Sequence, residues 1–271
     1  HSAVLLEEAA ERDVVVAFVG KPHRLNDRSQ AMKSLRDIEW RDYYQAEQTG
    51  WVLYIEGPSD LAILRAFARL LDYEEAEQAL ERPFVHYVGN QPAAMFRHFF
   101  GLREALHDLQ GIGIFDRIES TGHPELEGMV WTWQRREIEN YLCSRETLDA
   151  FAVHSGAQAA RQEAGLLWED PESQRRRSAM AKAIDKVAEA TRTLRGYDPW
   201  DSDCKASDEF LRPLFREYYE SLGLPDLMAK KNFHLLVPFV PVQQVDPEVR
   251  EKLERIVEVA RVAQPLAPDP S

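Results

Sequence analysis

One stretch, residues 51–71, limits what this chain can fold into more than any other part of the sequence. Its first five residues, 51–55, are all apolar or aromatic, and such a run predicts a strand buried on both faces. Gly57 and Pro58 then end the strand. Ser59 is a candidate N-cap, and the apolar residues after it have the spacing of an amphipathic helix. The stretch therefore predicts a strand, a sharp turn and a helix.

Two carboxylates lie at this predicted turn. Glu56 comes directly after the strand, and Asp60 lies in the first turn of the helix. In open α/β sheets ligands bind beyond the carboxyl ends of the strands, and carboxylate oxygens suit a divalent cation. The pair therefore predicts a site for a cation and its phosphate. The structural alternative is that an acid in the first turn compensates the helix dipole and that a polar strand end is simply hydrated.

The sequence after this stretch continues the alternation of strands and helices. In chain order it predicts a strand at 84–88, a helix at 91–109, and strands at 112–115 and 129–133. Such alternation is typical of a parallel sheet with helices on its faces. Before residue 51 the sequence predicts a short acidic helix, a strand at 14–19 and a surface connection with one helix near 29–38. The expected fold class is α/β.

A third carboxylate follows another predicted strand. Asp116 comes directly after the strand at 112–115, as Glu56 does after the strand at 51–55. In a right-handed β-α-β arrangement the carboxyl ends of the parallel strands emerge at the same edge of the sheet. We therefore expect Glu56, Asp60 and Asp116 to converge and to bind divalent metal together.

A charged segment, residues 131–142, follows the last predicted strand and contains Glu137 and Glu139. On a regular helix, side chains two positions apart point about 200° away from each other. These two carboxylates can therefore share a target only if the segment is extended or lies at a helix terminus. The alternative is a hydrated helix N-terminus.

Residues 144–227 show helical periodicity without strand signals, which predicts an all-helical insertion. Its basic stretch consists of Arg175, Arg176, Arg177, Lys182, Lys186, Arg192 and Arg195. Such cations suit the phosphate backbone of DNA, although a run of charge also occurs on hydrated helix faces. A final helix is predicted at about 247–262.

Composition narrows the class of protein. The 271 residues are 44% hydrophobic, enough for a full core. The net charge of −13 argues against a protein that coats nucleic acid without specificity, but it is compatible with a nucleic-acid enzyme whose carboxylates hold metal and whose basic patch is local. Two cysteines without a framework favour a reducing compartment. No apolar run approaches the roughly 20 residues of a membrane span. We expect a cytoplasmic protein without a membrane partner.

Four of these features occur together in one known family. They are Glu-Gly-Pro-Ser-Asp at 56–60, Gly-Ile-Gly-Ile-Phe-Asp-Arg at 111–117, Glu-Ile-Glu-Asn-Tyr-Leu at 137–142 and a late lysine. Their order resembles the Toprim domain of the overcoming-lysogenisation-defect (OLD) family of ATP-dependent nucleases, over residues 51–240. His1 and Ser2 are similar to the end of the Thr-His-Ser segment of that family's ATPase. We therefore expect the chain to be the carboxyl-terminal half of a longer protein.

The resemblance implies a Toprim-like, mainly parallel sheet flanked by helices, with the helical segment inserted. The implied domains are the end of the ATPase domain and a connection at 1–50, the Toprim core at 51–143, the insertion at 144–228, and the Toprim completion with the C-terminal helix at 229–271. Mg²⁺ or Mn²⁺ is the implied cofactor, as two ions, with ATP bound only by the missing domain. The implied partners are DNA, the N-terminal ABC-type ATPase domain and a second copy of the chain.

Carried over position by position, the resemblance implies roles for five carboxylates and one lysine. These are the metal ligands Glu56, Asp60, Asp116, Glu137 and Glu139, and the catalytic Lys231. Many relatives have serine at the position of Glu137. Lys230 is the neighbouring candidate for the lysine.

The chain departs from the family at Ile118, where the second acid of an Asp-x-Asp pattern is missing. Glu119 lies one residue further on. We expect Glu137 and Glu139 to complete the metal site with Asp116, and Glu119 to be dispensable.

Three functions follow from this reading. The first is a metal-dependent DNA endonuclease or nickase with a two-metal mechanism. The second is a degenerate Toprim module that binds nucleic acid or regulates its ATPase without cutting, motivated by Ile118. The third is a receiver-like domain with Asp116 as phospho-acceptor, which requires an acidic doublet where this chain has Glu56 and Gly57. We predict the first.

Overall fold

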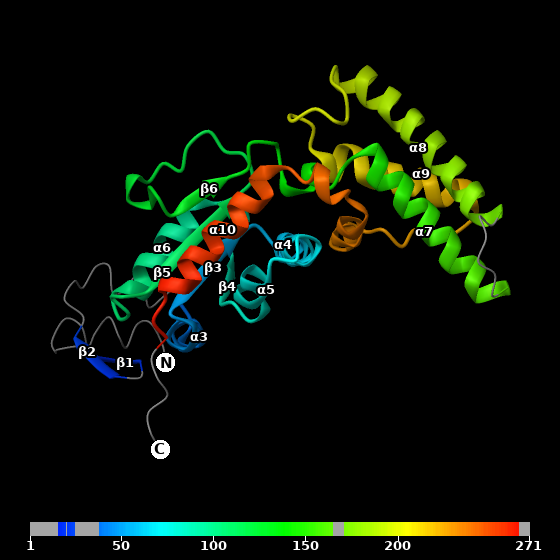
Figure 1. The fold of residues 1–271 in the computed structure, drawn as a ribbon. Helices are drawn as coiled ribbons and strands as arrows, with labels where there is room; N and C mark the ends of the chain where they lie inside the picture. Colours follow the sequence, from blue (N-terminus) through cyan, green and yellow to red (C-terminus); the bar gives the residue numbers. More distant parts are fainter. Residues whose placement is uncertain (1–15, 20, 25–37, 165–170, 266–271) are drawn as a thin grey trace. The chain divides into compact units, whose positions relative to one another are not determined.

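A computed structural model describes residues 16–19, 21–24, 38–164 and 171–265 (Figure 1). The described residues fall into two compact units. The first unit takes its residues from within His1–Gly57, Gln78–Trp131 and Glu254–Ser271, and the second from within Pro58–Glu77 and Thr132–Leu253. The expected acidic helix, residues 14–15 of the first expected strand, residues 29–37 of the next helix, and the pair His1 and Ser2 lie outside the described residues.

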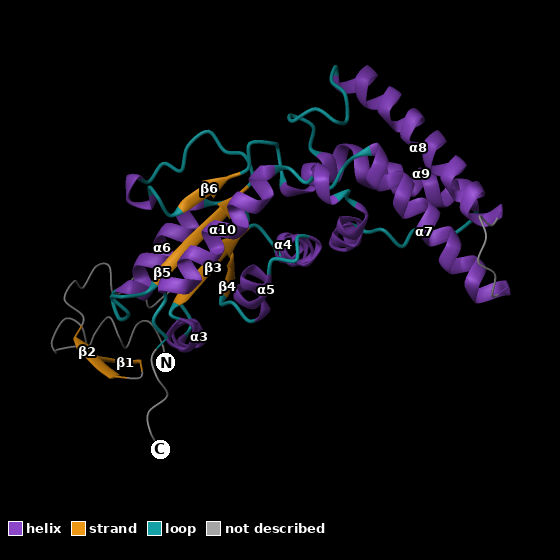
Figure 2. Cartoon of the chain, in the orientation of Figure 1, coloured by secondary structure: helices purple, strands orange, loops and turns teal. Residues whose placement is uncertain are grey.

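A parallel sheet is the centre of the fold. Its strands lie in the order β4-β3-β5-β6 (Figure 2), with bounds Trp51–Ile55 for β3, Val85–Tyr87 for β4, Gln110–Phe115 for β5 and Val130–Thr132 for β6. Strand β3 pairs in parallel with both β4 and β5. Its five residues are all buried, as the apolar run predicted. The α/β class is therefore confirmed, and a strand is present at each of the four positions predicted from residue 51 onward.

Two helices of the first unit have bounds that the sequence did not predict. Helix α6 spans Pro92–Arg103, shorter than the expected 91–109, and α3 spans Trp40–Thr49, where no helix was expected. Helix α3 ends at Gly50, whose φ of 70° is the left-handed conformation that glycine adopts without strain. Strands β1 (Val16–Val19) and β2 (Lys21–Arg24) form a separate antiparallel hairpin, of which only β1 was expected.

Two glycines in β5 allow α6 to pack closely on the sheet. A Cβ atom at Gly111 would lie 2.6 Å from the ring of Phe99, and one at Gly113 would lie 2.6 Å from the sulfur of Met95. Phe99 and Met95 both belong to α6 and are buried. The Gly-Ile-Gly pattern of β5 is therefore a packing requirement of this layer.

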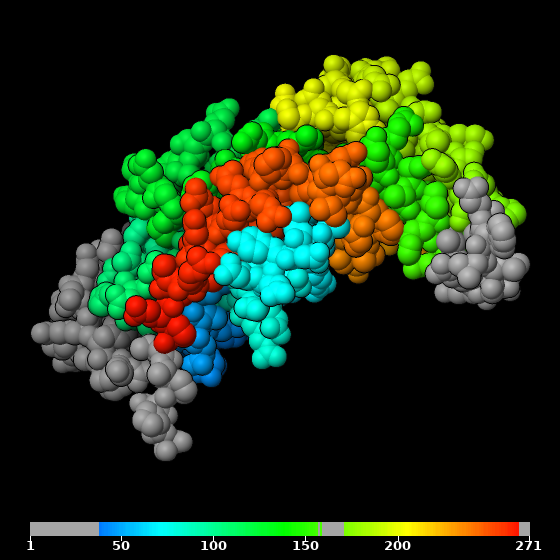
Figure 3. Space-filling model, in the orientation of Figure 1, coloured from blue at the N-terminus to red at the C-terminus, as the bar shows by residue number. Residues whose placement is uncertain are grey.

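The second unit is mainly helical. It contains α4 (Pro58–Leu70), η2 (Ile138–Tyr141), α7 (Arg145–Ala164), α8 (Pro171–Arg195), η3 (Ala206–Leu211), α9 (Arg212–Leu222), η4 (Lys230–Phe239) and η5 (Val242–Gln244). Helix α8 packs against both α7 and α9, and α4 packs against η4, beside which it lies in Figure 3. No strand lies among the described residues of 144–227, so the helical character of the expected insertion is confirmed.

The remaining elements are η1 (Pro124–Leu126), α5 (Glu74–Glu81) and α10 (Pro247–Val262). Helix α10 has the bounds that the sequence predicted. Within the part of the chain that the structure describes, no helix has both the length and the apolar character needed to cross a membrane.

Candidate functional site

Two of the expected site residues lie at the carboxyl edge of the sheet. Glu56 directly follows β3, and Asp116 directly follows β5. These strands are parallel neighbours, and their register pairs Tyr54 with Gly113, so the two acids emerge at the same edge. Both residues are partly exposed. The predicted strand-end placement is therefore confirmed for this pair, and its metal-binding role stays a prediction.

Asp60 lies in the first turn of α4, as expected. Its Oδ1 accepts a hydrogen bond of 3.3 Å from the hydroxyl of Ser59. The expected N-cap role of Ser59 is wrong, because the helix already begins at Pro58. Proline is favoured at the first helical position, where its fixed φ fits and its missing N–H is not needed. Asp60 belongs to the second unit while Glu56 and Asp116 belong to the first, so the convergence of the three stays a prediction.

Glu137 and Glu139 meet the condition that their spacing imposed. Glu137 is the N-cap of η2, with an extended backbone at φ −153° and ψ 168°, and Glu139 lies inside this short helix. The pair therefore lies across the start of a helix. Its side chains are not fixed about 200° apart, as they would be inside a regular helix. Both side chains are buried, with exposed fractions of 1% and 2%.

Glu137 is held by one hydrogen bond from the Ser207 backbone and by another to the Asn140 side chain. The Ser207 N–H donates to its Oε1 at 2.5 Å, and the Glu137 N–H donates to Asn140 Oδ1 at 3.1 Å. The Asn140 amide in turn donates to the Cys204 carbonyl at 2.9 Å. Burial raises the pKa of Glu137, while the hydrogen bonds from Ser207 and the charge of Lys230 act in the opposite direction. Glu137 is thus a positioned carboxylate.

Glu139 is the least satisfied carboxyl group of this region. Its Oε1 is buried and has no hydrogen-bond partner among the described residues. Burial first, and then the charge of Glu137, raise the pKa of Glu139 to about 8, while Lys230 lowers it and Asp60 raises it. Because the charges of Asp60 and Glu137 both act on Glu139, the three carboxyl groups form one electrostatic group. The buried oxygen of Glu139 is stabilised either by a proton or by a bound cation.

The charge of Lys230 acts on both of these glutamates, and that of Lys205 acts on Glu137. Lys230 is partly buried at the start of η4, whereas Lys231 is exposed. The expected catalytic role of Lys231 is untested, but the electrostatic contact belongs to its neighbour.

Ile118, which occupies the position of the missing second acid, also has apolar surroundings. Ile118 packs against the core cluster that contains Tyr54, Phe99 and Phe115, so it has no ligand to offer a cation. Glu119, the acid that follows it, is exposed.

The basic stretch of α8 is largely ion-paired. The pairs are Arg175 and Arg176 with Glu172, Arg177 with Asp149, Lys186 with Glu217, Arg192 with Asp198, and Arg195 with Glu209. Among the described residues no ion pair involves Lys182, which is exposed. Most of these cations therefore already have an acidic partner within the protein, which argues against the expected contact of the basic stretch with DNA.

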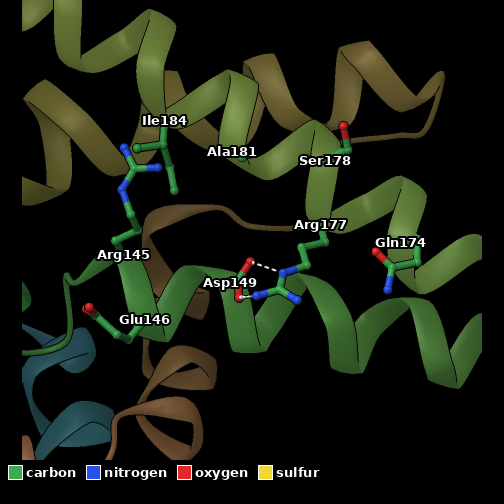
Figure 4. A pocket seen from close by; sticks show the side chains of 8 residues that line it. All are labelled: Arg145, Glu146, Asp149, Gln174, Arg177, Ser178, Ala181 and Ile184. Atoms are coloured by element: carbon green, nitrogen blue, oxygen red, sulfur yellow. Dashed lines mark hydrogen bonds and ion pairs between the residues drawn. The ribbon is translucent and has the colours of Figure 1, made fainter. Parts of the chain in front are cut away.

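A surface hollow of about 490 Å³ lies between α7 and α8. Figure 4 shows its lining, which consists of Arg145, Glu146, Asp149, Gln174, Arg177, Ser178, Ala181 and Ile184. Arg177 donates to Asp149 at 2.9 Å and Arg145 donates to Asp185 at 2.7 Å. Both arginines of the lining are thus ion-paired within the protein, and none of the expected metal ligands lines this hollow.

One cluster of chemically capable side chains gave no signal in the sequence. Asp42, His86 and His98 lie together in the first unit, although they are far apart along the chain and show no metal-binding spacing. Only the packing of their three elements brings them together.

Comparisons with models of protein families, with curated proteins and with solved structures found no match for this chain. Its class is therefore defined by what the fold contains: an α/β protein with parallel strands whose carboxyl ends carry acids, and a helical unit with two buried glutamates.

Proposed function

We propose that this chain is a metal-dependent phosphodiesterase that cuts or nicks DNA, as the Toprim nuclease part of an OLD-like, ATPase-coupled protein. The observation that carries the proposal is the buried Oε1 of Glu139, which lacks a hydrogen-bond partner among the described residues. Glu137, Asp60 and Lys230 act electrostatically on the same group. Perturbed carboxyl groups of this kind are concentrated at functional sites. The strand-end acids Glu56 and Asp116 are additional support.

The donor set fits a hard divalent cation. Carboxylate oxygens favour Mg²⁺ or Mn²⁺ over softer metals, and the Glu139 oxygen has an unmet need for a positive partner. In the two-metal scheme that the resemblance implies, Glu56, Asp60 and Asp116 would bind metal together, and Glu137 and Glu139 would complete the site with Asp116. When bound, such cations supply positive charge to the phosphate oxygens and make water a stronger nucleophile.

The protein's own residues divide the remaining work. Hydrogen bonds from Ser207 and to Asn140 keep the Glu137 side of the site in place. Lys230 is a donor without acceptor capacity, so its role is to stabilise negative charge on the reacting phosphate and not to ligate metal.

The test is cleavage of supercoiled plasmid in Mn²⁺ or Mg²⁺, with and without chelator. We expect nicking that chelator abolishes and that Glu139→Gln and Asp116→Asn each reduce by at least about 100-fold, since removing charge stabilisation at a reacting phosphate costs on this order. Glu119→Gln is the matched control, because Glu119 is an exposed acid three residues from Asp116, and it should cut like the unaltered chain. Undiminished cutting by Glu139→Gln, or cutting in chelator, would contradict the proposal.

A non-cutting module is the second candidate, and the packing of Ile118 into the core cluster favours it. It predicts that the chain binds plasmid but leaves it supercoiled at millimolar Mn²⁺. Binding without nicking in the same assay would therefore select this candidate over the nuclease.

A further inference from the structure

The Asp42, His86 and His98 cluster lies within the first unit. None of its residues belongs to the proposed nuclease site. Asp42 belongs to α3, His86 to β4 and His98 to α6, and each offers one ligand atom. The three atoms lie within 4.8 Å of one another. We propose that these residues bind a transition-metal ion of the Zn²⁺ class. The nuclease proposal does not require this ion, so the two proposals stand separately.

His98 has one ring nitrogen positioned and the other without a partner. Its Nδ1 lies 2.8 Å from the hydroxyl of the fully buried Tyr54. Its Nε2 is buried, makes no hydrogen bond to any described residue, and lies 3.6 Å from Asp42 Oδ2. Metal-ligating histidines usually have their second nitrogen fixed by a hydrogen bond. Tyr54 provides that bond here, and Nε2 is left beside the Asp42 carboxylate.

Asp42 is also fixed in place. Its Oδ2 accepts a hydrogen bond of 3.1 Å from the Glu39 N–H at the start of α3, and its exposed fraction is only 8%. A buried carboxylate beside two imidazoles is an expensive arrangement unless positive charge accompanies it. A metal ion supplies that charge.

His86 completes the set from the sheet side. Its ring stacks on that of His98 with centroids 3.6 Å apart and an interplanar angle of 17°. His86 is partly exposed while His98 is buried, so the cluster is open to solvent at His86. Burial lowers the pKa of both rings, that of His98 to about 4. Both imidazoles are therefore neutral at pH 7, the form in which histidine ligates metal.

The donor set selects the class of metal. Two imidazole nitrogens and one carboxylate oxygen suit Zn²⁺ and its neighbours Co²⁺ and Fe²⁺, and not Mg²⁺. With bonds of about 2.1 Å, ligands of a tetrahedral site lie roughly 3.4 Å apart. Closure of the 4.8 Å cluster therefore needs side-chain shifts on the order of 1 Å. Three protein ligands leave one coordination position for water or another molecule.

The test uses the full chain without an affinity tag, treated with chelator and then titrated with Zn²⁺ by calorimetry and with Co²⁺ by visible absorption. We expect one equivalent of either ion to bind, with a visible Co²⁺ spectrum and a raised melting temperature. His86→Gln and Asp42→Asn should each weaken binding at least about 100-fold, the upper end of what metal-site substitutions beyond the ligands produce.

The matched control is His107→Gln, which alters an exposed histidine of the same unit and should bind like the unaltered chain. Since His86 is partly exposed, His86→Gln is expected to fold, and circular dichroism verifies this before titration. A chain that binds neither ion at roughly 100 μM, or an unchanged affinity in folded His86→Gln, would overturn the proposal. If the three side chains form only a structural network of buried polar groups, one of these two results is expected.

Discussion

Glu139 couples stability to pH through a carboxyl whose pKa in the folded protein, about 8, lies above the ordinary 4.5. Between these values the unfolded chain has released a proton that the folded chain still holds. Stability contributed by this group is therefore fully present below about pH 4.5 and falls as pH rises toward 8. We expect the chelator-treated chain to lose up to about 1.4 kcal/mol per pH unit in this window from Glu139.

Glu139→Gln should flatten this dependence, because the amide does not titrate. Lys230 and Asp60 also face the group and are retained in the variant. Urea unfolding at a series of pH values from 5 to 9 measures the effect, with Glu119→Gln as the exposed control. The same slope in Glu139→Gln and in the unaltered chain would show that the buried carboxyl does not hold its proton.

The two adjacent lysines make a second prediction at this scale. The resemblance to the family assigned the catalytic role to Lys231, but the charge of Lys230 acts on both buried glutamates. We expect Lys230→Ala to lower plasmid-nicking turnover by about 100-fold, and Lys231→Ala to change it little because that side chain is exposed. The Mn²⁺ concentration for half-maximal activity should shift less than the turnover. A larger loss in Lys231→Ala would return the role to the position that the resemblance assigned.

At the scale of elements, the contact between α6 and β5 depends on the absence of a side chain in the strand. A Cβ atom at Gly111 would approach the Phe99 ring to 2.6 Å, and both residues are buried. Overpacking a core usually costs about 1–3 kcal/mol. We expect Gly111→Ala to lower the free energy of unfolding by this amount in urea titrations.

Gly57→Ala, between β3 and α4, is the control for a glycine that has room for a side chain. Nothing lies within 4 Å of a Cβ at Gly57, and its φ is not positive. The stability of this variant should equal that of the unaltered chain or rise slightly. Equal stability of Gly111→Ala and Gly57→Ala would mean that the ring of Phe99 can move aside without cost.

Elements with a strong local pattern could be predicted from the sequence, and those that depend on distant partners could not. The apolar run of β3 and the amphipathic spacing of α10 gave the observed bounds. Helix α3 was missed because its buried face holds Asp42 together with Tyr43 and Ala46, which blurs the apolar periodicity. The 3₁₀ helix η4 was missed because Pro238 interrupts it.

The same distinction applies to the candidate sites. Glu56 and Asp116 could be placed from strand ends alone, because parallel neighbours present their carboxyl ends at one edge. The partner of Glu137 could not, since the N–H of Ser207 is 70 positions away in sequence. The Asp42, His86 and His98 cluster needed the packing of three elements. Likewise, no local pattern linked Lys186 to Glu217 on α9.

At the scale of the whole molecule, the charge balance limits how DNA can bind. The net charge is −13, so the chain as a whole repels duplex DNA, and binding needs local cations that lack internal partners. The arginines at the start of α8 have such partners. Arg175 and Arg176 both pair with Glu172 and Arg177 pairs with Asp149, while the side chain of Arg176 is only 13% exposed.

We therefore predict that changing Arg175, Arg176 and Arg177 together to Gln changes the slope of the log–log plot of DNA affinity against salt concentration by less than about 0.9, the value for one phosphate contact. Three released phosphate contacts would reduce the log–log slope by about 2.7, at about 0.9 per contact. Ion-paired arginines contribute less, because each must exchange an internal carboxylate for a phosphate and gains little on balance. Fluorescence anisotropy of labelled duplex across about 50 to 200 mM salt measures the slope, and Lys182→Gln, which alters an exposed cation of the same helix, is the comparison. A decrease near 2.7 in the triple variant would contradict this prediction and assign the basic stretch to the DNA backbone.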